Sequence, residues 1–354
     1  MLKPTTTTTT LPLPHRPRPR PAPLSIARTH HRHGLTPPPT LLQAAPSFLT
    51  TGSVAASPLD HDEAYIVTVR IGTPPQLVPP DFDSNSADLW VAGPAVGAAS
   101  EQRFYDPAKT ASAVATEERW NITYAGRSEA GGRVWRDVVD VGGVRATQAV
   151  EVADREAAWF ETQDEYSRFV GLGLGGVVCG RRRRLGTYDF GYVDAAKYVG
   201  DITYTAANNS RGWWDIVATS YAVGEASGFV SRPLFGVVNT GSSLLYLPRD
   251  IVNTYYAGVA SAVYNETIGR VWLFGCNETL PISTLGIEDT HVTIPSEYLN
   301  YWPNGDGTCW GRIQAEPGLG YSIYGNVLLK AAFVVFDTVG PRMGGGGGER
   351  ISRW

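Results

Sequence analysis

Two short loops, 156 residues apart, each combine a carboxylate or carboxamide side chain with small hydroxylated neighbours. The loops consist of Asp83, Ser84, Asn85 and Ser86, and of Asn239, Thr240, Gly241 and Ser242. An apolar run follows each loop, at residues 89–91 and 244–247. A carboxylate at a strand end, with hydroxyls and backbone N–H groups beside it, can be held as an oriented general base. The repetition predicts two similar lobes that each present one polar side chain to a shared cleft.

The difference between the loops limits their chemistry. Two facing carboxylates can share one proton, so that one acts as base toward a water molecule and the other as acid toward the substrate. Asp83 can be the base, whereas the carboxamide of Asn239 can donate a hydrogen bond but cannot transfer a proton. Loss of a positioned acid or base typically costs about 10² to 10⁴ in rate. Asn85 adds strain wherever its loop requires a positive φ, although Asn tolerates that conformation better than most residues.

The composition indicates a large β-rich globular protein. The 354 residues are 43% hydrophobic and 18% charged, with 39 Gly and 25 Pro, which is ample for a core shared by two lobes. Residues 1–60 carry a net charge of +5, so the remaining body carries −9. An acidic body argues against nucleic acid as a partner. No apolar run approaches the roughly 18 residues that span a membrane, so we expect no membrane partner.

The first 60 residues are rich in Thr, Pro and Arg, including the unbroken run of Thr at 5–10. Such a segment cannot bury enough apolar surface to fold alone, and we predict that 1–60 is disordered. His30, His31 and His33 could ligate a metal, but no acidic or Cys ligand accompanies them. We therefore expect neither a metal nor a cofactor.

Several further segments carry a resemblance to a known family. They are the opening I-G-T-P-P-Q at 71–76, the hairpin N-I-T-Y at 121–124, and Y-G-N at 324–326. Together with the two loops, which match a duplicated D-T-G-S/T signature, they resemble the pepsin-like aspartic proteases. From Gly186 to Asp337 the chain is most similar to the fungal secreted penicillopepsin and aspergillopepsin type.

The resemblance implies a mainly β, bilobal fold with a peptide-binding cleft between the lobes. It places an N-terminal lobe at 61–185, a C-terminal lobe at 186–342 and a flexible tail at 343–354. After residue 176 a segment of a few tens of residues expected in the family is missing, and the Arg run 181–184 takes its place. We therefore expect the first lobe to be open at its edge near Val178. Residues 249–264 show apolar helical spacing and predict a helix.

The resemblance also assigns residues. Asp83 is the base and Asn239 replaces the second catalytic Asp, while Tyr124 takes the place of the tyrosine in the flap over the cleft. Tyr124 and Trp90 are expected to bind substrate, and Cys276 and Cys309 to form a disulfide, which leaves Cys179 over. A basic propeptide precedes the domain in this family, and 25–45 resembles a remnant of one.

Three functional hypotheses follow. The first is a peptide-binding pepsin homologue, impaired in catalysis because of Asn239, acting as a monomer on peptides or unfolded proteins. The second is an active secreted aspartic endopeptidase, and the third is a gene-prediction error whose product lacks a stable fold. The resemblance and four N-x-S/T sequons, at Asn121, Asn208, Asn265 and Asn277, favour a secreted glycoprotein, although no signal peptide is visible.

Overall fold

The structure is a computed structural model that describes residues 51–97, 103–124, 128–157, 160, 168–171, 177–181, 186–208, 210–225, 228–338 and 340–347. These residues form mainly strands, as the sequence predicted. The helical elements are short: η2 (Asp60–Asp62), α3 (Pro94–Gly97), η3 (Pro107–Lys109), η4 (Ala195–Lys197), α5 (Arg249–Ala257), η5 (Ser296–Tyr298) and α6 (Asn326–Leu329).

The first lobe is built from the strands at one end of the largest described sheet. They are β2 (Tyr65–Val67), β3 (Val69–Ile71), β4 (Gln76–Val78), β5 (Asp81–Asp83), β6 (Leu89–Ala92), β7 (Val114–Thr123), β8 (Glu129–Val141), β9 (Val144–Glu156) and β10 (Arg168–Gly171). The long hairpin of β8 and β9 is paired from Ala130 with Glu156 to Val141 with Val144. β7 pairs with β8 and gives the flap-like hairpin that the sequence predicted, whose tip at 125–127 lies outside the described residues.

The second lobe contains two smaller sheets. One consists of β14 (Asp215–Val223), β15 (Val230–Val238), β16 (Leu245–Leu247), β19 (Ser283–Ile287), β20 (Thr290–Ile294), β23 (Ile313–Ala315) and β24 (Ser322–Tyr324). The other consists of β17 (Val263–Asn265), β18 (Val271–Gly275), β21 (Asn300–Pro303) and β22 (Thr308–Gly311).

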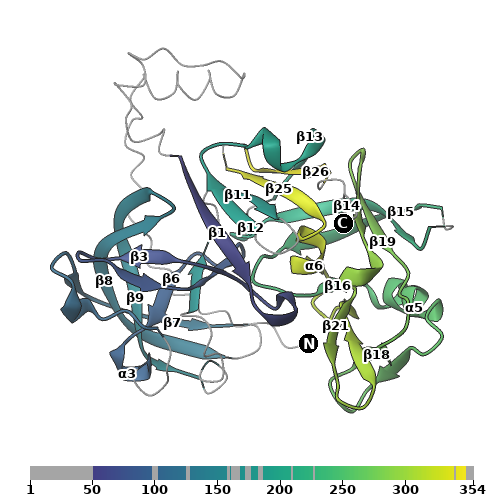
Figure 1. The fold of residues 1–354 in the computed structure, drawn as a ribbon, viewed down its shortest axis with the longest axis horizontal. Helices are drawn as coiled ribbons and strands as arrows, with labels where there is room; N and C mark the ends of the chain where they lie inside the picture. Colours follow the sequence, from purple (N-terminus) through teal and green to yellow (C-terminus); the bar gives the residue numbers. More distant parts are fainter. Residues whose placement is uncertain are drawn as a thin grey trace.

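The remaining strands join the lobes. They are β1 (Gly52–Pro58), β11 (Val177–Arg181), β12 (Gly186–Phe190), β13 (Val199–Ala206), β25 (Ala332–Asp337) and β26 (Arg342–Gly347). In Figure 1 they lie between β8 and β9 at one end and α5 and β18 at the other. Strands from both ends of the chain thus share one sheet, and the fold is the bilobal pepsin-like fold.

The same three-strand arrangement supports each polar loop. In the first lobe β10 lies between β5 and β6, parallel to the former and antiparallel to the latter. In the second lobe β24 lies between β15 and β16 in the same way. Because the inserted strand separates the two strands that each loop connects, the loop cannot close as a tight hairpin. Its polar side chains therefore stand at the end of the strands rather than within a turn.

Three expectations about the edges of the fold were wrong. β1 begins at Gly52, inside the segment predicted to be disordered, and pairs with β12 and β2. β26 lies inside the expected flexible tail, where Gly344 pairs with Val335 and Tyr204. Val178 is not at an open edge, since β11 pairs with β12 on one side and β25 on the other. Each of these strands pairs with one segment close in the sequence and with another far away, and local composition does not reveal the distant partner.

The glycines of β26 have a packing consequence. Gly344 and Gly345 line an apolar cavity of about 30 Å³ together with Ile216, Val238 and Leu328. A Cβ on Gly345 would meet no atom within 4 Å. The strand thus supplies backbone hydrogen bonds to the sheet but leaves part of the core beside it unfilled.

The predicted helix is shorter than expected. α5 ends at Ala257, where Gly258 follows, although the apolar spacing continues to residue 263. Val259 is buried, but Val263 is 61% exposed and begins β17. Glycine disfavours helix continuation, so the chain turns before the apolar pattern ends.

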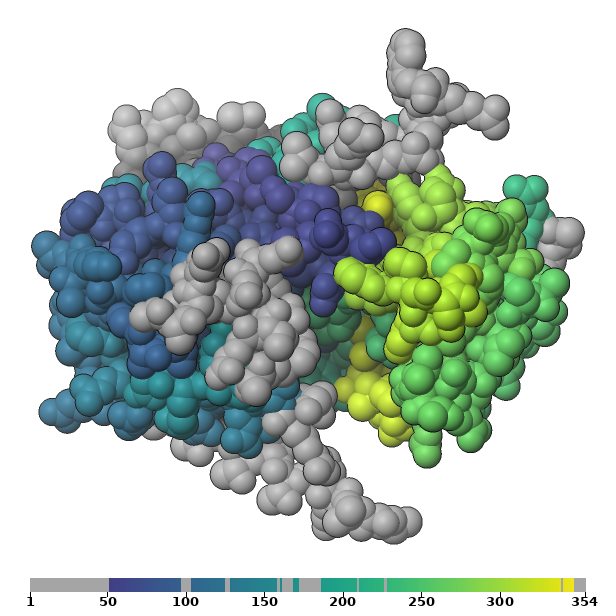
Figure 2. Space-filling view, turned by 60° about the horizontal axis from the view of Figure 1, so that its bottom comes forward, coloured from purple at the N-terminus to yellow at the C-terminus, as the bar shows by residue number. Residues whose placement is uncertain are grey.

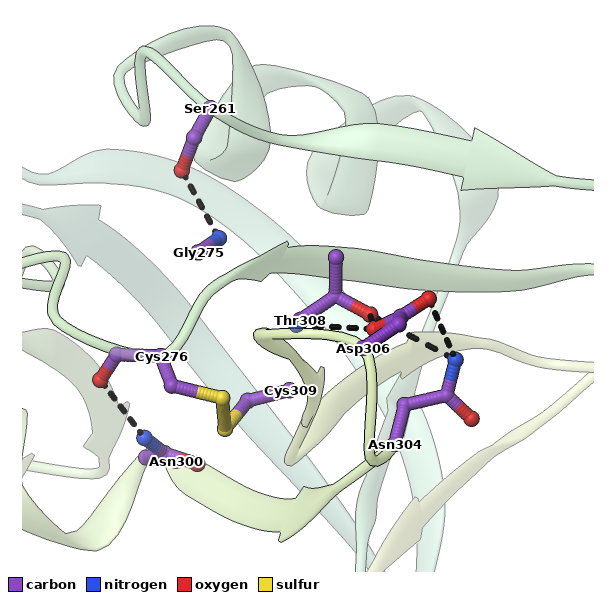
Figure 3. The surroundings of a disulfide bond; sticks show 8 residues. All are labelled: Ser261, Gly275, Cys276, Asn300, Asn304, Asp306, Thr308 and Cys309. Carbon is purple, nitrogen blue, oxygen red and sulfur yellow. Dashed lines mark hydrogen bonds between the residues drawn. A yellow bond between two sulfur atoms is a disulfide. The ribbon is translucent and has the colours of Figure 1, made fainter.

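The disulfide between Cys276 and Cys309 is confirmed, with Cα atoms 5.0 Å apart (Figure 3). Cys309 lies on β22, next to β18, and Cys276 follows β18 directly. The bond therefore ties two neighbouring strands of the second lobe. The three His residues expected not to bind metal lie outside the described residues. The side chain of Cys179 is likewise not described.

Candidate active site

Asp83 and Asn239 occupy equivalent positions at the ends of their strands. Asp83 is the last residue of β5, and Asn239 directly follows β15. The backbone N–H of Asn85 donates to Asp83 Oδ1 at 2.9 Å, and that of Gly241 donates to Asn239 Oδ1 at 2.8 Å. Each loop thus holds its side-chain oxygen with the N–H two residues further on.

Two hydroxyl groups lock the loops together across the lobe boundary. Ser84 Oγ donates to Val238 O at 2.9 Å and accepts from Thr240 N at 3.1 Å. In return, Thr240 Oγ1 donates to Phe82 O at 2.5 Å and accepts from Ser84 N at 2.9 Å. Both side chains are buried, so these bonds have little competition from water. The reciprocal pattern fixes the position of one loop relative to the other.

The structure brings the two candidate catalytic side chains close together. A Cβ on Gly241 would lie 2.9 Å from Asp83 Oδ1 and 3.3 Å from Asn239 Oδ1. Both oxygens therefore border the same small space, despite their separation in the sequence. Gly241 is required there because any side chain would collide with the Asp83 carboxylate.

The strain expected at Asn85 is absent. Asn85 is not among the residues with positive φ in the described chain, so its loop does not demand a glycine conformation. Asn85 lowers the stability of the fold for a different reason. Its Oδ1 is buried without a hydrogen-bond partner among the described residues. Ser242 contributes through its backbone, where its O accepts from Asn326 N at 2.6 Å.

The environment of Asp83 favours its protonated form. Burial raises the pKa of Asp83 above the usual 3.8, while the Asn85 N–H and the Ser86 hydroxyl act in the opposite direction. Asn239 brings no charge to the pair, because a carboxamide does not titrate. Of the two facing side chains, only Asp83 can therefore titrate.

Tyr124 reaches back from the β7–β8 hairpin toward this site. Trp90 Nε1 donates to Tyr124 Oη at 2.7 Å. The Tyr124 ring packs against Phe160 and Phe169, with centroids 5.8 and 5.5 Å away. Burial raises the pKa of Tyr124, and the negative charges of Asp83, Asp88 and Glu151 add to that rise.

Trp90, which the resemblance assigned to substrate binding, lies beneath the surface. It is fully buried and packs against Trp120 and Phe160, with centroids 5.4 and 5.2 Å away. Its indole instead positions the Tyr124 hydroxyl. The position of Trp90 at the end of an apolar run could not reveal that the β7–β8 hairpin would cover it.

The sequence also missed two acidic residues beside this cluster. Parallel pairing of β6 with β9 places Glu151 next to Trp90. Burial raises the pKa of Glu151 to about 8, and the nearby charge of Asp88 adds to the rise. Burial raises the pKa of Asp88 as well. No local motif indicates a role for Glu151, because only the pairing of distant strands places it next to Trp90.

In the space-filling view the two lobes lie side by side, with a recess where they meet (Figure 2). No group of three or more His, Cys, Asp or Glu within the described ranges could hold a metal ion. None of the helices described in the structure is long and apolar enough to cross a membrane.

The comparisons with known proteins agree with this geometry. A family model described as eukaryotic aspartyl protease matches residues 64–183 and 176–346. Endothiapepsin of Cryphonectria parasitica is 35% identical over 352 residues, which cover 89% of this chain and 84% of the relative. Penicillopepsin-3 of Penicillium janthinellum is 36% identical, with 90% and 86% covered. Aspergillopepsin-1 of Aspergillus oryzae is 34% identical, with 90% and 87% covered.

Proposed function

Because the chain belongs to the eukaryotic aspartyl protease family, we propose that it is a pepsin-type peptide-binding protein with impaired catalysis. One observation carries this proposal: Asn239 occupies the position equivalent to Asp83 and accepts the equivalent backbone hydrogen bond. The site thus keeps the arrangement of a two-carboxylate centre with one carboxylate replaced by a neutral amide.

Asp83 retains the role of base. When ionised, its carboxylate can take a proton from a water molecule held between the loops, and the hydroxyl locks of Ser84 and Thr240 keep it oriented. The water would then add to the carbonyl carbon of a bound peptide. This half of the reaction needs only the first loop.

Asn239 supports binding but not proton transfer. Its Oδ1 accepts from Gly241 N, so Nδ2 is the atom left to donate to a peptide carbonyl oxygen. A hydrogen bond can polarise that carbonyl, but the developing oxyanion receives no proton from it. The missing acid step should lower the rate by about 10² to 10⁴.

The lone carboxyl group also changes the pH dependence. Since burial raises the pKa of Asp83, acidic pH keeps it protonated and unable to act as base. Residual cleavage should therefore rise with pH through the pKa of Asp83, above 3.8, in a single limb. A second carboxylate at position 239 would give the two-limbed profile of a coupled pair.

The substrate class we propose is peptides and unfolded protein segments, bound by a monomer whose lobes divide near residue 185. Tyr124, above the catalytic loop, would cover the bound chain. The resemblance to fungal secreted enzymes and the sequons support a secreted glycoprotein.

The test is to restore the second carboxylate. Asn239→Asp should raise kcat/KM on an unstructured protein at pH 3 to 5 by at least about 10² over the unmodified protein. Asp83→Ala in that variant should return the rate to the unmodified level. Asn277→Asp, at an exposed turn, makes the same chemical change away from the site and should leave the rate unchanged.

Two results would contradict the proposal. Cleavage by the unmodified protein within about tenfold of Asn239→Asp would favour the working endopeptidase, which the names of the relatives support. A folded Asn239→Asp variant with no gain would show that Asn239 is not the limiting defect. Failure of the unmodified chain to give a cooperative unfolding transition would favour the gene-prediction error.

A further inference from the structure

A groove opens on the second lobe, away from the catalytic loops. It has a volume of about 340 Å³ and lies between the β17–β18 hairpin and the loop that joins β21 to β22. Its apolar lining is Val263, Ile268, Leu273 and Phe274. Its polar lining is Ser261, Asn265, Asn304, Asp306 and Thr308, several of which Figure 3 shows beside the disulfide.

One sequon borders this groove. Asn265 ends β17, and Thr267 follows in the sequon N-E-T. Asn265 Oδ1 accepts from the backbone N–H groups of Thr267 and Ile268, at 2.9 and 3.0 Å. These bonds fix the carboxamide, and its Nδ2 makes no hydrogen bond to any residue that the structure describes. The nitrogen that glycosylation modifies is therefore the free end of an oriented side chain.

The other sequons do not combine a fixed carboxamide with a place on the groove. Asn208 Oδ1 also accepts from the sequon residue Ser210 N, at 2.9 Å, but Asn208 does not line the groove. Asn121 lies within β7, paired with Gly131 in the flap hairpin. Asn208 exchanges backbone hydrogen bonds with Asp215, and Asn277 follows the disulfide residue Cys276. None of the three lines the groove.

We propose that Asn265 carries an N-linked glycan whose first N-acetylglucosamine residue lies in this groove. In the transfer, Asn265 Nδ2 loses a proton and forms a bond to C1 of the sugar of a lipid-pyrophosphate-linked oligosaccharide. The bond from C1 to the pyrophosphate breaks, and the lipid pyrophosphate leaves. This proposal rests on the proposed function, in which the protein is a secreted glycoprotein.

The lining of the groove suits one face of a sugar. Val263, on β17, is 61% exposed, and Ile268, in the turn that follows, is 42% exposed. The C–H face of a pyranose would remove their apolar surface from water.

The opposite wall of the groove offers polar partners. Asp306 Oδ1 accepts from the N–H of Thr308, and Asn304 Nδ2 donates to Asp306 Oδ2 at 3.3 Å (Figure 3). Hydrogen bonds from Thr308 lower the pKa of Asp306, so its carboxylate stays ionised and can accept from sugar hydroxyls. Apolar residues on one side and acceptors on the other match the two kinds of surface on a monosaccharide.

The first experiment measures occupancy. The full chain is expressed behind a cleavable secretory leader in a eukaryotic host, and each sequon is analysed by mass spectrometry. Asn265 should be modified; Asn265→Gln and Thr267→Ala should each remove one glycan, and Thr267→Ser should keep it. An unmodified Asn265 beside a modified Asn208 or Asn277 would overturn the proposal while leaving the secreted glycoprotein intact. If no sequon is modified, both fail, although the Asn239→Asp assay still tests the cleft.

The second experiment tests whether the first sugar residue lies in the groove. Trimming the glycan to one N-acetylglucosamine should leave Tm unchanged, whereas the Asn265→Asp variant, which lacks the sugar, should melt about 2–4 °C lower. The double substitution Val263→Ser and Ile268→Ser should keep occupancy but abolish this difference. If that variant keeps the full difference in Tm, or if none exists in the unmodified chain, the sugar does not occupy the groove.

Discussion

The two polar loops share one scaffold and, apart from the hydroxyl residues Ser84 and Thr240, differ in two side chains. Each lies at the end of a strand triple, and each places an N–H on the oxygen of its key residue. Asp83 faces Asn239 where the loops meet, and Asn85 stands where the second loop has Gly241. The first difference removes a titratable group, and the second adds a side chain.

The comparison shows that the conformation of each loop does not depend on whether its key residue can titrate. The backbone N–H of Gly241 donates to an amide oxygen as it would to a carboxylate oxygen, so Asn239 preserves the loop. The lock between Ser84 and Thr240 involves hydroxyls and backbone groups, not the key residues. The loop geometry therefore does not require a carboxylate at position 239.

The largest effect on stability should come from breaking the lock. Thr240→Val keeps the shape but leaves Ser84 N–H and Phe82 O buried without their partner, which should cost about 2–5 kcal/mol. Thr240→Ser keeps the hydroxyl and serves as the control. Urea denaturation measures the difference. Ser84→Ala should cost a similar amount, and a loss below about 0.5 kcal/mol in both would show that the loops are held by other contacts.

Alanine at position 241 and alanine at position 85 should affect stability differently. Gly241→Ala puts a Cβ 2.9 Å from Asp83 Oδ1, and the forced shift should cost about 1–3 kcal/mol. Asn85→Ala removes a buried oxygen that lacks a partner, so its effect should stay within about 1 kcal/mol and can be stabilising. Thermal unfolding and binding of a pepsin-type transition-state analogue measure both. Equal losses in the two variants would mean that the loops are equally crowded.

A pH-dependent effect concerns the buried acidic residues near Trp90. The folded state holds the Glu151 proton more tightly than the unfolded chain, since its pKa rises from 4.5 to about 8. The unfolded state thus binds fewer protons between these values, and stability falls as pH rises through that window. Asp83 and Asp88 act in the same direction.

Glu151→Gln should therefore flatten the decline of Tm between pH 4.5 and 8. The exposed Glu118→Gln on β7 is the matched control. An unchanged slope in Glu151→Gln would mean that the decline comes from other groups.

Much of the site could be predicted from the sequence. The duplicated loop predicted that Asp83 and Asn239 would meet, and their oxygens border one space beside Gly241. The strand patterns and the resemblance gave a mainly β bilobal fold, and the resemblance implied the bond between Cys276 and Cys309. These features are encoded locally, in turn residues, alternation and repeated motifs.

The tertiary structure alone decided which side chains are covered and by what. Trp90 becomes a buried support for Tyr124 because the β7–β8 hairpin lies over it, and Glu151 reaches it through parallel pairing. β11 is inserted between β12 and β25, and the glycines of β26 pair on both sides. Strand pairing joins segments far apart in the chain, and its register depends on the partner strand as much as on the sequence of the segment itself. The sequence alone therefore shows an amide at position 239, whereas the structure shows that this amide and Asp83 border the same space.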